Sequence, residues 1–281
     1  MQQLIGKQAP TRVRSRPRSL VCGAMSWLGR VRTVVNHGLK PAGLELRRVT
    51  EWNDDPRAFI PFAATLDGAR RAGLSVPDFV DQAYNVPGAT EAAVQRMREL
   101  GAFDGSIERS CEIGPGTGRY LVRIRAICRP GYYEIYETAP DWAEWLVQQH
   151  GVVLQPTDGK SLAATPSSSI DLVHAHKVFE ALSTLTALGY LREMARVVRP
   201  GGRVVFDAMT EGCLDAQVLE RWMAAGAIHG AYPAVLPRSL VLGLAQAWGL
   251  RLLGSFIVPM KPGSTECFVF LSERQSEQNG A

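Results

Sequence analysis

The chain has 281 residues, of which 46% are hydrophobic and 21% charged, and its formal net charge is +4. This length can bury one domain of about 200 to 250 residues with an appendage, and the composition is ordinary for a globular protein. The charge is uneven, because residues 1–44 carry eight Lys or Arg and no Asp or Glu, which leaves 23 basic and 27 acidic residues for the rest. The net basicity therefore gives no reason to expect a body that binds nucleic acid.

The five cysteines are scattered, odd in number and free of C-x-x-C spacing: Cys22, Cys111, Cys128, Cys213 and Cys267. This pattern predicts buried or free thiols in a reducing compartment, and so a cytoplasmic protein. It suggests neither a disulfide framework nor a zinc site.

Residues 1–44 form a basic N-terminal arm. Residues 1–24 are Arg-rich, lack apolar periodicity and are predicted to be disordered. No apolar stretch of the length of a secretory signal follows the charges, whereas an organellar transit peptide and a true start at Met25 stay open as alternatives. Residues 25–40 place apolar side chains on one face of a basic amphipathic helix, which suits either peripheral contact with a membrane or packing against protein.

Residues 45–105 are predicted to form a helical cap. Three helices are expected, over residues 58–72, 76–84 and 90–100, with Gly73 and Gly101 at helix ends. Such a segment either lines a substrate pocket or only packs against the domain that follows.

A glycine turn stands at residues 112–118, which read Glu-Ile-Gly-Pro-Gly-Thr-Gly. A strand over residues 107–113 leads into it, and the apolar spacing of residues 119–128 predicts a helix after it. Glycines with this spacing let a ligand approach the backbone at a helix start. The dinucleotide fingerprint G-x-G-x-x-G is disfavoured, because the third glycine comes one residue early, at Gly118, and position 119 is Arg.

Strands and helices alternate after the glycine turn. Further strands are expected at residues 132–136, 152–154, 170–174, 204–206, 252–258 and 267–271. This rhythm predicts an α/β, doubly wound, Rossmann-like sheet of seven mostly parallel strands. The last strand is antiparallel, because only a Pro/Gly loop joins it to the one before. Arg238 and Arg251 interrupt the most apolar stretch, which is too short to span a membrane.

The chain resembles the class I S-adenosylmethionine-dependent methyltransferases over about residues 90–272. The methyltransferase domain itself is expected at residues 106–272, and a polar tail follows at residues 273–281. Residues 112–118 resemble the E/D-x-G-x-G-x-G first motif of that family. Glu137 stands 19 residues past Gly118, where the family has its ribose-binding acid, and Asp158-Gly159 is similar to the loop that contacts adenine. The resemblance implies S-adenosyl-L-methionine as cofactor, bound by Glu112, Gly114, Gly116, Gly118, Glu137, Asp158 and Gly159. Their structural alternatives are a helix-start acid at Glu137 and a turn-forming Asp158.

A base for methyl transfer is expected past the carboxyl ends of the fourth and fifth strands. His176 is the first choice, because imidazole titrates near neutrality, with His174 and Asp207 as the other catalytic candidates. The H-x-H pair lacks an evident third ligand, so no metal site is predicted.

The acceptor is predicted to be a small molecule or a sugar or glycan precursor, methylated on oxygen. The supporting rim is mildly polar, with His176, Tyr232, Lys261 and Glu266, and no N-P-P-[FY] motif of amino-methylating enzymes follows the fourth strand. Nucleic acid is not an expected partner. Two alternatives stay open: a non-catalytic S-adenosylmethionine-binding regulatory or scaffolding subunit, and a transferase that uses another nucleotide-like cofactor.

Overall fold

The computed structural model describes residue 35, residues 60–224 and residues 233–273. The chain divides into a unit of residues 1–49 and a unit of residues 50–281, and the fold described here is that of the second unit. The arm of residues 1–44, with the helix predicted at 25–40, and the tail at 274–281 lie outside these ranges apart from residue 35. Within them, no helix combines the length and the apolarity needed to cross a bilayer.

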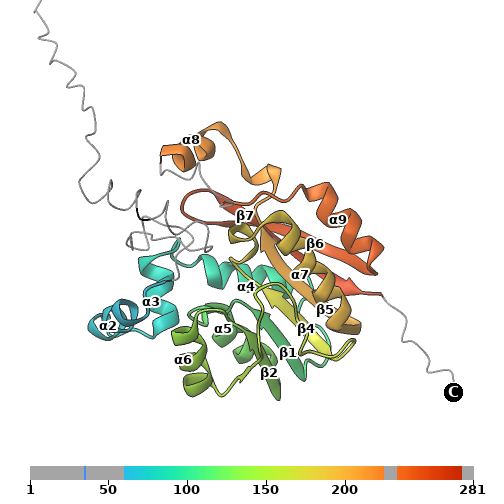
Figure 1. The fold of residues 1–281 in the computed structure, drawn as a ribbon, viewed down its shortest axis with the longest axis horizontal. Helices are drawn as coiled ribbons and strands as arrows, with labels where there is room; N and C mark the ends of the chain where they lie inside the picture. The colour runs from blue at the N-terminus through green and yellow to red at the C-terminus, as the bar shows by residue number, and fades with distance from the viewer. Residues whose placement is uncertain (1–34, 36–59, 225–232, 274–281) are drawn as a thin grey trace, which may run out of the picture. The chain divides into compact units, whose positions relative to one another are not determined.

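A seven-stranded sheet forms the centre of the described unit (Figure 1). Its strands are β1 (Arg109–Ile113), β2 (Tyr132–Tyr136), β3 (Val153–Leu154), β4 (Ile170–Ala175), β5 (Val198–Ala208), β6 (Leu250–Pro259) and β7 (Ser264–Ser272). They lie in the order β3-β2-β1-β4-β5-β7-β6. Strands β1 to β5 pair in parallel, whereas β7 pairs antiparallel with both β5 and β6. The predicted fold class, including the antiparallel last strand, is confirmed.

The strand order reverses between β1 and β4. The chain builds outward from β1 through β2 to β3, then returns to the other side of β1 with β4. In open parallel sheets, ligands bind beyond the carboxyl ends of the strands at such a reversal. The glycine turn follows β1 at this edge, so the topology places it at the expected ligand site.

Helices cover both faces of the sheet. They are α2 (Phe62–Ala72), α3 (Val76–Ala83), α4 (Ala89–Glu99), α5 (Arg119–Cys128), α6 (Pro140–His150), α7 (Thr184–Val197), α8 (Ala216–Ala224) and α9 (Arg238–Ala247), with short 3₁₀ turns η2 (Phe179–Ala181) and η3 (Glu211–Cys213). Side chains of α4 and α5 pack with Leu172 and Val205 on one face. Side chains of α7 and α9 pack with Val173 and Phe206 on the other. Adjacent residues of β4 and β5 thus point to opposite, equally buried faces.

The three helices predicted N-terminal to the sheet are present, and α4 belongs to the domain core. Ala93, Val94 and Met97 of α4 are buried in the same cluster as Tyr120 and Ile124 of α5. Helices α2 and α3 contact each other and lie beside α5 and α6 in Figure 1. The N-terminal helices therefore include one that supports the sheet directly.

The fifth strand is longer than the three residues, 204–206, that the sequence predicts. It begins at Val198, which pairs with Ile170, and the register shifts before Leu172 pairs with Arg203. Gly202 permits this close pairing, because a Cβ at that position would stand 2.8 Å from the carbonyl oxygen of Asp171. The Pro-Gly-Gly sequence that predicted a turn therefore forms an irregular stretch within the strand.

Candidate active site

The glycine turn connects β1 to α5 by backbone conformations that favour glycine. Gly114, Gly116 and Gly118 have φ values of +60°, +52° and +74°, in the left-handed region. The N–H of Gly114 donates to the carbonyl oxygen of Tyr136 at 2.8 Å, which ties the turn to β2. A Cβ at Gly116 would meet no atom within 4 Å, so the turn is open to a ligand at this position.

Glu137 follows β2 and faces the glycine turn. One carboxylate oxygen accepts from the N–H of Gly116 and the other from the N–H of Ala139, each at 2.8 Å. Burial raises the pKa of this carboxyl, while the backbone N–H groups oppose that rise. The structure thus brings together two residues that the sequence places 21 positions apart, and leaves a carboxylate able to accept further hydrogen bonds.

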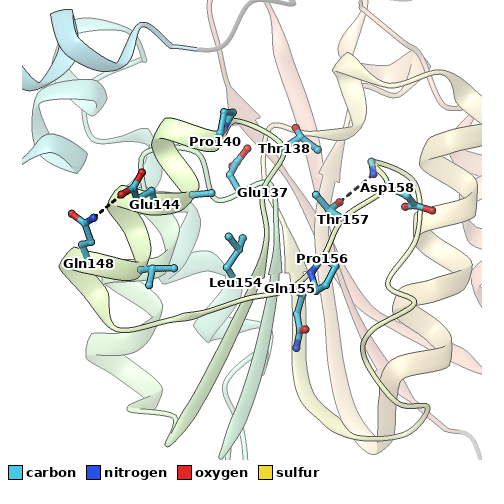
Figure 2. A pocket seen from close by; sticks show the side chains of 13 residues that line it. Glu137, Thr138, Pro140, Glu144, Gln148, Leu154, Gln155, Pro156, Thr157 and Asp158 are labelled. Carbon is cyan, nitrogen blue, oxygen red and sulfur yellow. Dashed lines mark hydrogen bonds between the residues drawn. The ribbon is translucent and has the colours of Figure 1, made fainter.

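An open groove runs from Glu137 between α6 and the loop after β3 (Figure 2). In Figure 2, Glu137 and Leu154 lie toward α6, whereas Thr138, Pro156, Thr157 and Asp158 lie toward the loop after β3. Apolar side chains from α6 complete the lining: Pro140, Ala143 and Val147. A carboxylate at one end of a largely apolar groove suits a ligand with a ribose diol and a flat base.

Asp158 and Gly159 line this groove, and the Asp158 carboxylate also closes its own turn. It accepts from the backbone N–H groups of Lys160 and Ser161 at 3.0 and 2.8 Å and from the Ser161 hydroxyl at 3.0 Å. These bonds lower its pKa, and Figure 2 shows the side chain turned away from Glu137. The turn-forming role weighed in the sequence analysis is therefore present.

Glu112 and His174 meet in the sheet interior. The Tyr133 hydroxyl lies 2.7 Å from a carboxylate oxygen of Glu112 and 2.8 Å from Nε2 of His174. Burial, the largest effect, raises the pKa of Glu112 to about 8 and lowers that of His174 well below its usual value. Since Glu112 and His174 are both buried among the strands, this geometry favours a role in positioning the sheet beneath the glycine turn.

His176 follows the end of β4, as predicted, and lies near Asp207. Asp207 was predicted to lie past the fifth strand, but β5 extends to Ala208, so Asp207 is the second-last residue of that strand and pairs with Cys267 of β7. Nδ1 of His176 lies 3.9 Å from a carboxylate oxygen of Asp207, and its ring stacks on Tyr120 at 3.8 Å between centroids. Burial lowers the pKa of His176 to about 4, so the ring is neutral at pH 7. Its Nε2 is buried without a hydrogen-bond partner among the described residues.

Asp207 is held by its neighbours more tightly than the sequence suggests. It accepts from the backbone N–H of Lys177 at 2.7 Å and from the Thr265 hydroxyl, and its carboxylate lies 2.9 Å from Nζ of Lys177. Although burial raises its pKa, Lys177 and the other neighbours together lower it. Asp207 is thus a paired carboxylate that fixes the turn after β4.

Glu180 is a buried acid of the same region that the sequence analysis missed. It is 3% exposed, and within the described part of the chain one of its carboxylate oxygens has no hydrogen-bond partner. Burial and the charge of Asp207 raise its pKa to about 7. An acid shortly after the fourth strand was the available signal, but nothing in the spacing indicates that it is buried. Among the described residues, no group of three or more His, Cys, Asp or Glu could hold a metal ion.

The polar rim that supported a sugar acceptor is only partly present. Glu266 is buried and accepts from Arg238 at 2.8 Å and from Ser255 at 2.7 Å, which leaves it committed to structure. Lys261 lines a second groove, near η3 and the β6–β7 loop. Tyr232 lies outside the described residues.

The match to a family model covers this site. Residues 111–206 match the model of a methyltransferase domain, a stretch that contains the glycine turn, Glu137, Asp158 and the residues after β4. The chain contains a class I S-adenosylmethionine-dependent methyltransferase domain. A comparison with curated protein sequences finds no significant match.

Solved methyltransferase structures share the domain's fold. An O-methyltransferase family protein from Burkholderia thailandensis is 15% identical, with a TM-score of 0.55, and the match covers 87% of this chain and 84% of that one. Magnesium protoporphyrin IX methyltransferase from Synechocystis, solved with bound S-adenosylhomocysteine, is 10% identical, with a TM-score of 0.53 and coverage of 85% and 98%. The N-methyltransferase NodS from Bradyrhizobium japonicum, also solved with S-adenosylhomocysteine, is 13% identical, with a TM-score of 0.53 and coverage of 76% and 98%.

The methyltransferase site has room and chemistry for its cofactor. Gly116 is open on the side where a Cβ would project, and Glu137 presents a carboxylate next to it. The groove that begins at Glu137 offers apolar surface to a base, including Leu154, which is 43% exposed. The residues present therefore fit S-adenosylmethionine.

Proposed function

We propose that this methyltransferase acts on a hydroxyl group of a small molecule or of a sugar or glycan precursor. The observation that carries the proposal is the group of buried proton-accepting side chains at the carboxyl ends of β4 and β5: His176 and Glu180 after β4, and Asp207 in the last two residues of β5. A hydroxyl must lose its proton as it is methylated, so a reaction on oxygen needs such groups close by.

Cofactor binding is assigned to the glycine turn and the groove. Gly114, Gly116 and Gly118 would keep side chains away from the ligand, while Glu137 would accept hydrogen bonds from the ribose hydroxyls. Glu112 would support the turn from within the sheet, and Asp158 with Gly159 would border the adenine. When bound, S-adenosylmethionine supplies a methyl group on a positively charged sulfur.

His176 is the first candidate for accepting the acceptor's proton directly. The ring is neutral at pH 7, and its Nε2 accepts no hydrogen bond from the residues that the structure describes. Stacking on Tyr120 fixes the plane of the ring. Asp207 would act on the reaction by holding Lys177 and the turn after β4, and His174 by supporting Glu112 through Tyr133.

The test is release of S-adenosylhomocysteine with a panel of sugar, glycan-precursor, phenol and amine acceptors. We expect turnover with at least one hydroxyl acceptor and a loss of about a hundredfold in His176→Ala, the size typical of general-base removal. His150→Ala, at the end of α6, is the matched histidine control. Turnover with amines alone would contradict oxygen methylation. Binding of S-adenosylhomocysteine without turnover on any acceptor would favour the non-catalytic regulatory or scaffolding subunit.

The arm outside the described residues adds a second, separate proposal. Its basic amphipathic segment, residues 25–40, would contact an anionic membrane surface at the periphery. The support is the sequence pattern alone, and the proposal does not affect the assignment of the catalytic domain.

A further inference from the structure

The turn that carries Glu180 contacts the glycine turn on one side and the segment at Ala234 on the other. Glu180 belongs to η2, which follows β4 after the turn at Lys177. Two residues earlier, Val178 packs against the glycine turn so closely that a Cβ on Gly114 would stand 2.7 Å from it. The backbone carbonyl of Glu180 accepts from the N–H of Ala234 at 2.7 Å, which fixes the other side of the turn.

The charges that act on Glu180 come from each element around it. Asp207 at the end of β5 opposes its ionisation, whereas Lys177 after β4 and Arg119 at the start of α5 favour it. His176 belongs to the same cluster through Asp207 but is neutral above about pH 5, since its pKa is about 4. Lys177 is already paired with Asp207 at 2.9 Å, so the residues of ranges 60–224 and 233–273 supply no cation to Glu180 alone.

The unpartnered carboxylate oxygen of Glu180 needs an explanation. A buried polar atom without a hydrogen bond costs about 1–3 kcal/mol, and a buried carboxylate without a cation costs more. Such a cost at a ligand edge is consistent with a side chain that acquires its partner on binding.

We propose that Glu180 matches the charge of the methyl donor, as a carboxylate when S-adenosylmethionine is bound and as a carboxylic acid when S-adenosylhomocysteine is bound. This inference rests on the proposed function of the site. In the transfer, the acceptor's O–H bond breaks and an O–CH₃ bond forms. The C–S bond breaks with its electron pair staying on sulfur. The released proton, accepted first by His176, passes on to Glu180. The summed charge of Glu180 and the cofactor is therefore the same before and after methyl transfer.

The consequence is a difference in proton release between two ligands that differ by one methyl group and one charge. Burial and Asp207 place the pKa of free Glu180 at about 7, so the side chain is largely protonated at about pH 6.5. If the sulfonium lowers this pKa by about one unit, binding of S-adenosylmethionine releases about half a proton at that pH. The affinity of the protein for S-adenosylmethionine then rises about fivefold between about pH 6 and pH 8. S-adenosylhomocysteine lacks the charge and produces neither effect through Glu180.

The experiment is calorimetric titration of the full chain at about pH 6.5 in two buffers of different ionisation enthalpy, which counts the protons released on binding. Both ligands are titrated into wild type, Glu180→Gln and the control Glu220→Gln, an exposed acid on α8. The α-amino group shared by the ligands contributes equally to all three proteins, so the difference between variants isolates Glu180. We expect extra proton release with S-adenosylmethionine in wild type and in Glu220→Gln, and its loss in Glu180→Gln with unchanged affinity for S-adenosylhomocysteine.

Equal proton release in wild type and Glu180→Gln overturns the proposal. If Glu180→Gln does not fold, the wild-type comparison decides alone, because equal pH dependence of the two affinities also overturns it. Failure of either ligand to bind would instead contradict the assigned cofactor, so the two failures are distinguishable.

Discussion

Replacing Glu137 with Gln tests the cofactor assignment at the side chain that joins the glycine turn to the groove. Each Glu137 carboxylate oxygen accepts one backbone N–H at 2.8 Å, from Gly116 and from Ala139. An amide group has only one oxygen, so its NH₂ must face one of these donors. The variant therefore loses one hydrogen bond to the turn and one acceptor for the ribose diol.

The expected loss of affinity follows from the negative charge of the Glu137 carboxylate, which accepts the hydrogen bonds. A hydrogen bond to a charged group contributes about 1.5–3 kcal/mol, which corresponds to about a 10- to 150-fold loss in affinity for S-adenosylhomocysteine. The lost bond to the turn also lowers the free energy of unfolding by about 1–3 kcal/mol, because a buried N–H is left unpaired.

The assay combines calorimetric titration with S-adenosylhomocysteine and urea unfolding of the same samples. Asp141→Asn is the matched control, since Asp141 is an exposed acid in the first turn of α6, four residues away. Its affinity should stay within about twofold of wild type, because exposed side chains away from a ligand contribute little. Unchanged affinity in Glu137→Gln, with the protein folded, would refute a role for Glu137 in holding the ribose.

Three further predictions concern the glycine turn, the sheet interior and the arm. Gly114→Ala should lower the free energy of unfolding by more than about 2 kcal/mol, because backbone strain at φ +60° adds to a clash with Val178, 2.7 Å from the new Cβ. Gly116→Ala should lower the free energy of unfolding by only about 1–2 kcal/mol. It should weaken the binding of S-adenosylhomocysteine, measured by calorimetry, at least about tenfold. Burial raises the folded-state pKa of Glu112 to about 8, so its contribution to stability is full below about pH 4.5 and is lost as the pH rises through about 8. Urea unfolding of Glu112→Gln should show a smaller loss of stability over this pH range. Identical pH profiles for wild type and Glu112→Gln would contradict this role of Glu112. A protein that starts at Lys40 should lose co-sedimentation with anionic vesicles, and unchanged sedimentation would remove the membrane proposal.

The sequence predicted most of the fold because its boundaries are marked by local signals. Helix α6 begins at Pro140 and ends at His150, and the next residue, Gly151, has the φ of +60° expected of a glycine that ends a helix. The antiparallel pairing of β6 and β7 followed from a short loop alone. By contrast, the start of β5 depends on pairing between Val198 and Ile170, a distant contact that no local pattern reveals.

The candidate site was predictable in position but less so in chemistry. Spacing placed Glu137 beside Gly116 correctly, because the carboxyl ends of adjacent parallel strands meet at one edge. Burial, however, decides what an ionisable group can do. It makes His176 a weak base and gives Glu180 a pKa of about 7, and neither effect is visible in the sequence.

The most direct test of the cofactor site is a crystal structure of the chain with S-adenosylhomocysteine. We predict that the ribose hydroxyls contact Glu137, that the ligand backbone passes beside Gly116, and that the adenine occupies the groove bordered by Leu154 and Asp158. A ligand bound elsewhere, or one that leaves Glu137 without a contact, would contradict this assignment.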